Sequence, residues 1–176
     1  MIRLNDITAS LLSYHPKADL SLVEKAYVYS AKVHQGQVRL SGEPYLSHPL
    51  EVSYILTRMK MDVISVVSGL LHDTLEDTNA ELHEIERLFG KEAANIVDGV
   101  TKISKMQFTS HKERQAENMR KMILAMATDI RVIMVKLADR LHNMQTLGFQ
   151  VPEKQKLIAR ETLEIYSPLA GRMGIY

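Results

Sequence analysis

The helical spacing of apolar residues is the feature that most constrains the fold of this chain. The clearest case is the segment 129–147, whose apolar residues recur at the three- and four-residue intervals that place side chains on one face of an α-helix. Only 8 glycines and 5 prolines occur among 176 residues, and long segments follow the helical period rather than the alternation of a half-exposed strand. We therefore predict an all-α domain.

Capping and turn signals divide this pattern into successive helices and one polar loop. Ser21 with Glu24 has the spacing of a capping box, and Gly36 and Gly90 suit the ends of helices. Residues 37–47 contain the turn-forming run Ser-Gly-Glu-Pro, which predicts a small hairpin-like loop. The predicted helices are 2–13, one that begins after Ser21, 50–59, 63–76, 81–89, 91–103, 114–127, 129–147 and 153–166, with a loop at 104–112.

Composition narrows the classes of function. A hydrophobic content of 45% and a charged content of 24% are ordinary for a soluble globular protein. The net charge of +1 gives no overall attraction to DNA or to a membrane surface, and we find neither a transmembrane run nor a signal peptide. We therefore expect a cytoplasmic protein with no DNA and no membrane partner. Because the chain has no cysteine, any metal site must use His, Asp and Glu side chains.

Four ionisable side chains lie within two turns of the predicted helix 63–76 and its end. On a continuous helix, His72, Asp73, Glu76 and Asp77 share one arc, and like charges one turn apart destabilise a helix by a few tenths of a kcal/mol. No Lys or Arg lies nearby in the sequence to compensate. Two interpretations follow: a solvated acidic face, or a divalent cation held by His72 and Asp73 with Glu76 and Asp77 beside it.

Two further candidates lie elsewhere in the chain. His48 stands at the entry to a predicted helix, and Asp139 lies on the narrow polar stripe of the segment 129–147. Asp139 has an alternative role, a surface pairing with Arg140 or Lys136. Two imidazoles and two carboxylates are suitable ligands for manganese, iron or zinc, but the residues sit on three separate segments, so no local spacing proves the site.

Four motifs resemble those of a known family. They are His34-Gln35-Gly36-Gln37-Val38-Arg39, Ser41-Gly42-Glu43-Pro44-Tyr45 continuing to His48-Pro49, Leu71-His72-Asp73-Thr74-Leu75-Glu76-Asp77, and Lys136-Leu137-Ala138-Asp139-Arg140-Leu141-His142-Asn143-Met144. In this order they resemble the hydrolase domain of RelA/SpoT homologues, members of the HD metal-dependent phosphohydrolase superfamily that set levels of the alarmone (p)ppGpp. The resemblance covers nearly the whole chain. It implies an HD-type helical bundle over residues 1–176, in which 167–176 begins the connection to a synthetase domain, with synthetase and regulatory domains as partners in the parent chain.

The resemblance also implies roles for individual residues. The activity it implies is hydrolysis of the 3′-diphosphate of ppGpp or pppGpp to GDP or GTP and pyrophosphate, in the stringent response, with one Mn²⁺ ion per domain. The implied ligands of the ion are His48, His72, Asp73 and Asp139. The implied residues that activate and orient the attacking water are Glu76 and Asp77. The implied contacts to the guanosine nucleotide are Arg39, Ser41, Asn143 and Thr146.

One position departs from the family pattern, and two rival functions stay open. Leu40 stands where many bifunctional members carry lysine, which removes a cation beside the nucleotide and bears on base affinity or substrate preference. Two roles are open for His34 and His142, lining the cleft or a structural one, and we expect the structural role. Tyr45 either packs against the turn or stacks near a base. The rivals are an HD phosphohydrolase acting on 5′-nucleotides or cyclic dinucleotides, and a regulatory domain without turnover; the presence of every metal residue argues against the second.

Overall fold

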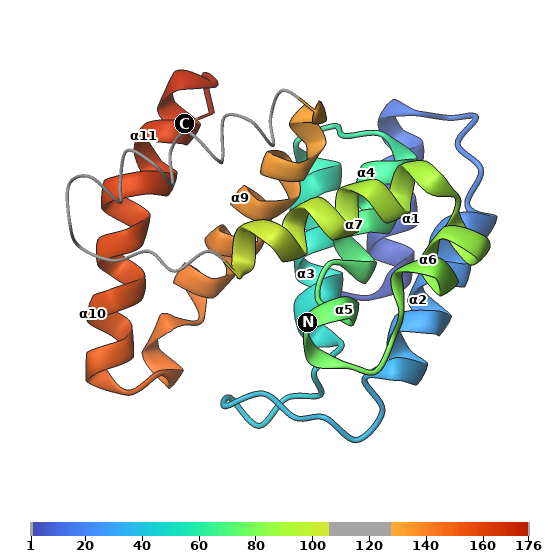
Figure 1. The fold of residues 1–176 in the computed structure, drawn as a ribbon. Helices are drawn as coiled ribbons and strands as arrows, with labels where there is room; N and C mark the ends of the chain where they lie inside the picture. The colour runs from blue at the N-terminus through green and yellow to red at the C-terminus, as the bar shows by residue number, and fades with distance from the viewer. Residues whose placement is uncertain (1, 106–127, 176) are drawn as a thin grey trace.

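A computed structural model describes residues 2–105 and 128–175 of the chain, and within these residues the secondary structure is helical with no strand (Figure 1). The all-α prediction is therefore confirmed. The elements are α1 (Leu4–Tyr14), α2 (Ser21–Val33), α3 (Ser47–Arg58), α4 (Val63–Leu71), α5 (Thr74–Asp77), α6 (Leu82–Phe89), α7 (Lys91–Ser104), α9 (Ile130–Gln145), the 3₁₀ turn η1 (Leu147–Phe149), α10 (Pro152–Glu161), the π-helical turn η2 (Thr162–Tyr166) and α11 (Ser167–Arg172). The predicted helix 114–127 and most of the predicted loop 104–112 lie outside the described residues.

Helix α4 forms the centre of the bundle. It packs against α2, α3, α7 and α9, and all residues from Ser65 to Leu71 are buried. Gly69 allows α3 to come close, because a Cβ added there would lie 2.8 Å from Ser53 Oγ and 2.7 Å from Leu56 Cδ1. The central position of α4 means that its C-terminal end, which carries His72, meets several other elements.

The loop before α3 is hairpin-like, as predicted. Val38 and Pro44 form an isolated antiparallel bridge. The backbone N–H of Tyr45 donates to the carbonyl of Gln37 at 3.0 Å and closes the loop. Helix α3 begins at Ser47, three residues earlier than predicted, so His48 lies in its first turn.

The prediction of one continuous helix over 63–76 is wrong, because the helix breaks between α4 and α5. At the break, two side chains bond to main-chain carbonyls three residues upstream. His72 Nδ1 lies 2.7 Å from the carbonyl oxygen of Gly69, and Thr74 Oγ1 donates to the carbonyl of Leu71 at 2.6 Å. His72 and Asp73 occupy the break itself, so Glu76 and Asp77 belong to a separate short helix.

The capping box predicted at Ser21 is also wrong. Ser21 is the first residue of α2, and its backbone N–H donates to Asp19 Oδ1 at 2.9 Å, so an upstream aspartate supplies the acceptor. At the other end of the chain, α10, η2 and α11 form one rod beside α9 (Figure 1). The rod continues past the predicted end at 166, because α11 follows η2 directly and includes Pro168.

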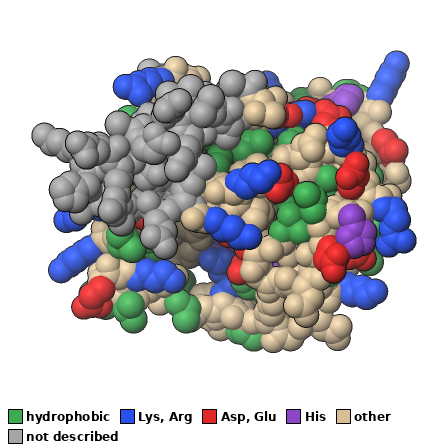
Figure 2. Space-filling view, viewed as in Figure 1, with side chains coloured by type: hydrophobic (Ala, Val, Ile, Leu, Met, Phe, Trp, Pro, Cys, Tyr) green, Lys and Arg blue, Asp and Glu red, His purple; other side chains and the backbone are tan. Residues whose placement is uncertain are grey.

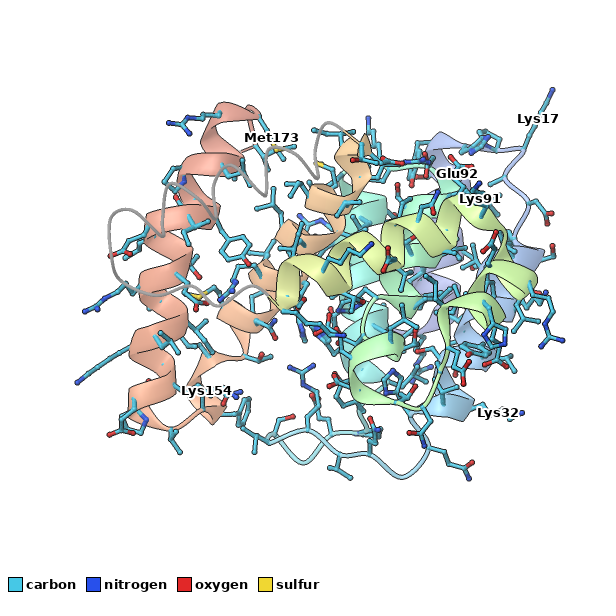
Figure 3. The ribbon with its side chains drawn as sticks, in the orientation of Figure 1. Lys17, Lys32, Lys91, Glu92, Lys154 and Met173 are labelled. Carbon is cyan, nitrogen blue, oxygen red and sulfur yellow. The ribbon has the colours of Figure 1, made fainter. Side chains whose placement is uncertain are left out.

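Charged side chains of both signs are interspersed over the surface that Figure 2 shows beside the grey residues. Several lysines, among them Lys17 and Lys32, extend away from the helices (Figure 3). Among residues 2–105 and 128–175, we find no helix with both the length and the apolar character that a membrane crossing requires.

Candidate functional site

Four side chains from three segments converge where α3, the α4–α5 break and α9 meet. His48 Nε2 lies 3.2 Å from His72 Nε2, 3.2 Å from Asp139 Oδ1 and 3.3 Å from Asp73 Oδ2. His72 Nε2 lies 2.9 Å from Asp73 Oδ1 and 3.9 Å from Asp139 Oδ1. The structure thus brings together the four residues that the sequence nominated as metal ligands.

These distances fit the coordination of a single cation. With metal–ligand bonds of about 2.1 Å, neighbouring ligand atoms lie about 3.0 Å apart in an octahedral site and about 3.4 Å apart in a tetrahedral one. Donor atoms of His48, His72 and Asp139, all buried, lie within 4.8 Å of one another, which makes them a possible metal site. Two nitrogens and carboxylate oxygens suit several divalent ions.

The orientation of the His72 ring supports a cation at this point. A carbonyl only accepts hydrogen bonds, so the contact with Gly69 puts a proton on His72 Nδ1 and, in the neutral ring, leaves a lone pair on Nε2. That lone pair faces carboxylate oxygens, which also only accept. Burial acts to lower the pKa of His72, but Asp73 and Asp139 outweigh it and raise the pKa to about 9. The negative charge around Nε2 therefore attracts positive charge to the cluster.

Asp139 is held from both sides by residues of its own helix. Lys136 Nζ donates to Asp139 Oδ2 at 2.7 Å, and Asn143 Nδ2 donates to Oδ1 at 2.6 Å. Burial acts to raise the pKa of Asp139, but the charge of Lys136 and the hydrogen bond with His48 outweigh burial. The pKa of Asp139 therefore lies well below its ordinary value. The pairing of Asp139 with Lys136 that we considered exists, but it is buried and leaves Oδ1 facing the imidazoles, rather than lying on the surface.

Tyr45 links Asp73, one of the four candidate metal ligands, to Asp77. Its hydroxyl donates to Asp73 Oδ2 at 3.0 Å and also contacts Asp77 Oδ2. Its ring stacks on His34, with centroids 4.5 Å apart. Burial and the charge of Asp73 raise the pKa of Tyr45, which keeps the hydroxyl protonated as a donor. Tyr45 therefore orients Asp73 and Asp77 from the hairpin-like loop.

Glu76 lies in the same cleft, next to a hydroxyl and a buried lysine. Burial raises the pKa of its carboxyl, while a hydrogen bond with Ser104 and the charge of Lys136 oppose that shift; the net shift is upward. Lys136 Nζ also donates to Ser104 Oγ at 2.8 Å. The raised pKa makes Glu76 a stronger base than an ordinary exposed carboxylate.

The predicted nucleotide contacts are divided between two neighbouring clefts. Arg39 and Asn143 line a cleft of about 650 Å³ together with Glu76 and three of the four candidate metal ligands, His48, Asp73 and Asp139. Ser41 and Thr146 line a second cleft of about 310 Å³. The larger cleft also includes Leu40, the Tyr166 side chain and Lys154, which Figure 3 labels on α10.

Sequence reasoning missed the polar partners of the cluster. His142, expected to be structural, has its Nδ1 2.7 Å from Nδ1 of His48 and also lines the smaller cleft. Burial, together with the charges of His48 and Arg39, lowers the pKa of His142 to about 4. The available signal was its spacing: His142 follows Asp139 by three residues, which places both on one face of α9.

Comparisons with known proteins agree with this geometry. A family model described as "HD domain" matches residues 26–176. A "GTP pyrophosphokinase" from Myxococcus xanthus is 64% identical over 165 residues, which are 92% of this chain and 22% of the relative. The "Bifunctional (p)ppGpp synthase/hydrolase SpoT" of Escherichia coli strain K12 is 50% identical over 176 residues, all of this chain and 25% of the relative.

A solved structure, described as a metazoan ortholog of SpoT that hydrolyzes ppGpp, matches with a TM-score of 0.69 and covers 86% of each chain at 24% identity. At that identity, the likeness supports the fold alone. The chain spans about a quarter of the length of these two curated relatives. The chain belongs to the HD domain family, among the RelA/SpoT homologues.

Proposed function

We propose that this domain hydrolyses the 3′-diphosphate of ppGpp and pppGpp, with Mn²⁺, and releases pyrophosphate together with GDP or GTP. The observation that carries the proposal is the cluster of His48, His72, Asp73 and Asp139 with the carboxyl of Glu76 in the same cleft. The name of the Escherichia coli relative includes (p)ppGpp hydrolysis, which supports the choice of substrate.

The four ligands are proposed to hold one ion through two imidazole nitrogens and two carboxylates. When bound, such an ion lowers the pKa of a coordinated water and offsets the negative charge of phosphate groups. The protein contributes the orientation: Gly69 fixes the His72 ring, and Lys136 and Asn143 fix the two oxygens of Asp139. This support keeps the donor atoms in place before an ion binds.

Glu76 is proposed as the general base. The oxygen of a water molecule attacks the phosphorus attached to the 3′-oxygen, and Glu76 accepts the proton that the water loses. The P–O3′ bond breaks with its electron pair on the 3′-oxygen, which takes up a proton from solvent to give the free 3′-hydroxyl. Its raised pKa suits this role, because proton transfer to a base is favoured as the pKa of the base approaches the working pH. Asp77, held by Tyr45, is proposed to orient the water rather than to accept its proton.

The two clefts are proposed to bind the nucleotide. Arg39 supplies positive charge beside the metal cluster, and its guanidinium carbon lies 5.9 Å from the centre of the Tyr45 ring. Ser41 and Thr146 offer hydroxyl groups in the smaller cleft. Because the curated relatives are about four times longer, we also propose that synthetase and regulatory domains belong to the same parent chain, joined through residues 167–176.

Product analysis tests the proposal directly. The purified protein is incubated with ppGpp and Mn²⁺, and we expect GDP and pyrophosphate in equal amounts. Asp73→Ala should abolish turnover, whereas Asp98→Ala, which removes a surface ion pair with Lys102, is the matched control and should not. Turnover by Asp73→Ala at the parental rate would refute the site.

A substrate panel separates the rival functions. If cyclic dinucleotides or 5′-nucleotides are cleaved faster than ppGpp, the domain is an HD phosphohydrolase of another specificity. If ppGpp binds but is not cleaved with Mn²⁺ present, or after EDTA treatment and return of Mn²⁺, the domain is regulatory.

A further inference from the structure

Nitrogen Nδ1 of His48 has an unusual partner, the Nδ1 atom of a second histidine. The two nitrogens of His48 and His142 are 2.7 Å apart, and the ring centroids are 4.9 Å apart. Both side chains are buried. At this distance one Nδ1 carries a proton and donates a hydrogen bond, and the other Nδ1 accepts it. Either histidine can be the donor, so the pair has two arrangements.

The metal cluster selects one of the two arrangements. His48 Nε2 faces His72 Nε2 and the carboxylates, so it needs a free lone pair to bind a cation. A neutral His48 with a free Nε2 carries its proton on Nδ1. His142 Nδ1 must then accept the hydrogen bond from His48 Nδ1–H, which requires His142 to be neutral and to carry its own proton on Nε2.

We infer that His142 is a positioning residue that fixes the tautomer and ring orientation of His48 for metal binding. The inference rests on the proposed metal site. For His72, the same task falls to the main-chain carbonyl of Gly69, which the end of α4 holds in place. His48 lies in the first turn of α3, and its partner comes instead from α9.

Helix α9 therefore supplies both a ligand and an orienting group. Asp139 and His142 are three residues apart, so they lie on one face of the helix and both contact His48. His142 also lines the smaller cleft with Ser41 and Thr146. In the required tautomer, His142 carries an N–H donor on Nε2. Its ring contacts the proposed ligand His48 and lines the smaller cleft proposed for the nucleotide.

Metal affinity tests the inference without any substrate. His142→Asn keeps an acceptor close to the position of Nδ1, whereas His142→Phe keeps a ring and removes the acceptor. We expect His142→Phe to weaken Mn²⁺ binding by roughly 10- to 100-fold and His142→Asn to restore most of the affinity. Mn²⁺ binding is measured by electron paramagnetic resonance titration of the full chain, with the unfolding temperature without metal recorded for each variant.

Controls separate this inference from the proposed function. His83→Phe changes a histidine that is 76% exposed and remote from the cluster, and it should bind Mn²⁺ like the parent. If His142→Phe binds like the parent while Asp73→Ala does not bind, the role of His142 is refuted and the metal site stands. If Asp73→Ala also binds like the parent, the metal site itself is wrong.

A second measurement needs no substitution at all. In ¹⁵N-histidine-labelled protein loaded with Zn²⁺, long-range proton–nitrogen NMR distinguishes protonated from unprotonated ring nitrogens. We expect a protonated Nδ1 on His48 and an unprotonated Nδ1 on His142. A protonated Nδ1 on His142 would overturn the inference even if His142→Phe failed to fold.

Discussion

Adding one methyl group at Gly69 should loosen the centre of the bundle. In Gly69→Ala, the new Cβ would lie 2.7 Å from Leu56 Cδ1, 2.8 Å from Ser53 Oγ and 3.3 Å from Ser53 Cα. The first two atoms belong to side chains that can move, but the third is backbone, so α3 and α4 must separate slightly. The Gly69 carbonyl bonds to His72, so that separation reaches a proposed metal ligand.

Two opposing contributions set the magnitude. Replacing a helical glycine by alanine stabilises a helix by up to about 1 kcal/mol. Overpacking a dense core costs about 1 to 3 kcal/mol. We therefore expect Gly69→Ala to lower the free energy of unfolding by about 0 to 3 kcal/mol. We also expect weaker Mn²⁺ binding, because the His72 ring shifts relative to His48.

Gly171→Ala is the matched control. Gly171 lies in α11, and a Cβ added there would meet no atom of residues 2–105 and 128–175 within 4 Å. This variant should be neutral or more stable by up to about 1 kcal/mol, so the two variants should differ by about 1 to 3 kcal/mol. Urea unfolding of parent and variants without metal measures both. If Gly69→Ala is as stable as Gly171→Ala, the close packing of α3 on α4 does not constrain the site as argued.

Three further predictions concern the cleft and the helix junctions. Tyr45→Phe removes the hydroxyl that holds Asp73 and Asp77 but keeps the ring, so we expect the Mn²⁺ affinity to fall by about tenfold in a metal titration. An unchanged Mn²⁺ affinity would exclude the role of Tyr45 in linking Asp73 to Asp77. Arg131→Met should cost about 1 to 2 kcal/mol in urea unfolding at pH 7, because Arg131 joins α9 to the starts of α4 and α7. The hydrogen bond from Arg131 lowers the pKa of Asp129. The stability that this bond contributes is therefore present above the unfolded-state pKa of about 4 and is lost as the pH falls below that value. If the cost of Arg131→Met stays constant or grows at pH 3, the ion pair with Asp129 is not its source. Leu40→Lys adds a cation to the larger cleft and should lower the KM for ppGpp by about threefold in steady-state kinetics, with little change in kcat. A change in kcat with an unchanged KM would argue against an effect on substrate binding.

Periodicity and motifs predicted the helices and nominated the residues, because both signals are local. The apolar repeat in 129–147 becomes α9, and the turn-forming run before His48 becomes the hairpin-like loop. Local signals failed at the end of α4. The hydrophobic period of 63–76 continues through His72 and Asp73, whereas the structure ends α4 at Leu71, and the side chains of His72 and Thr74 bond to upstream carbonyls there.

The sequence by itself determined the helical character of the chain and the chemistry of its candidate ligands. Only the tertiary structure decided that His48, the α4–α5 break and α9 meet within hydrogen-bonding distances. It alone showed that His142, which lies three residues after Asp139 on the same face of α9, contacts a proposed ligand. The physical reason is range: a helix forms from contacts three and four residues apart, whereas this site depends on packing between residues up to 94 positions apart.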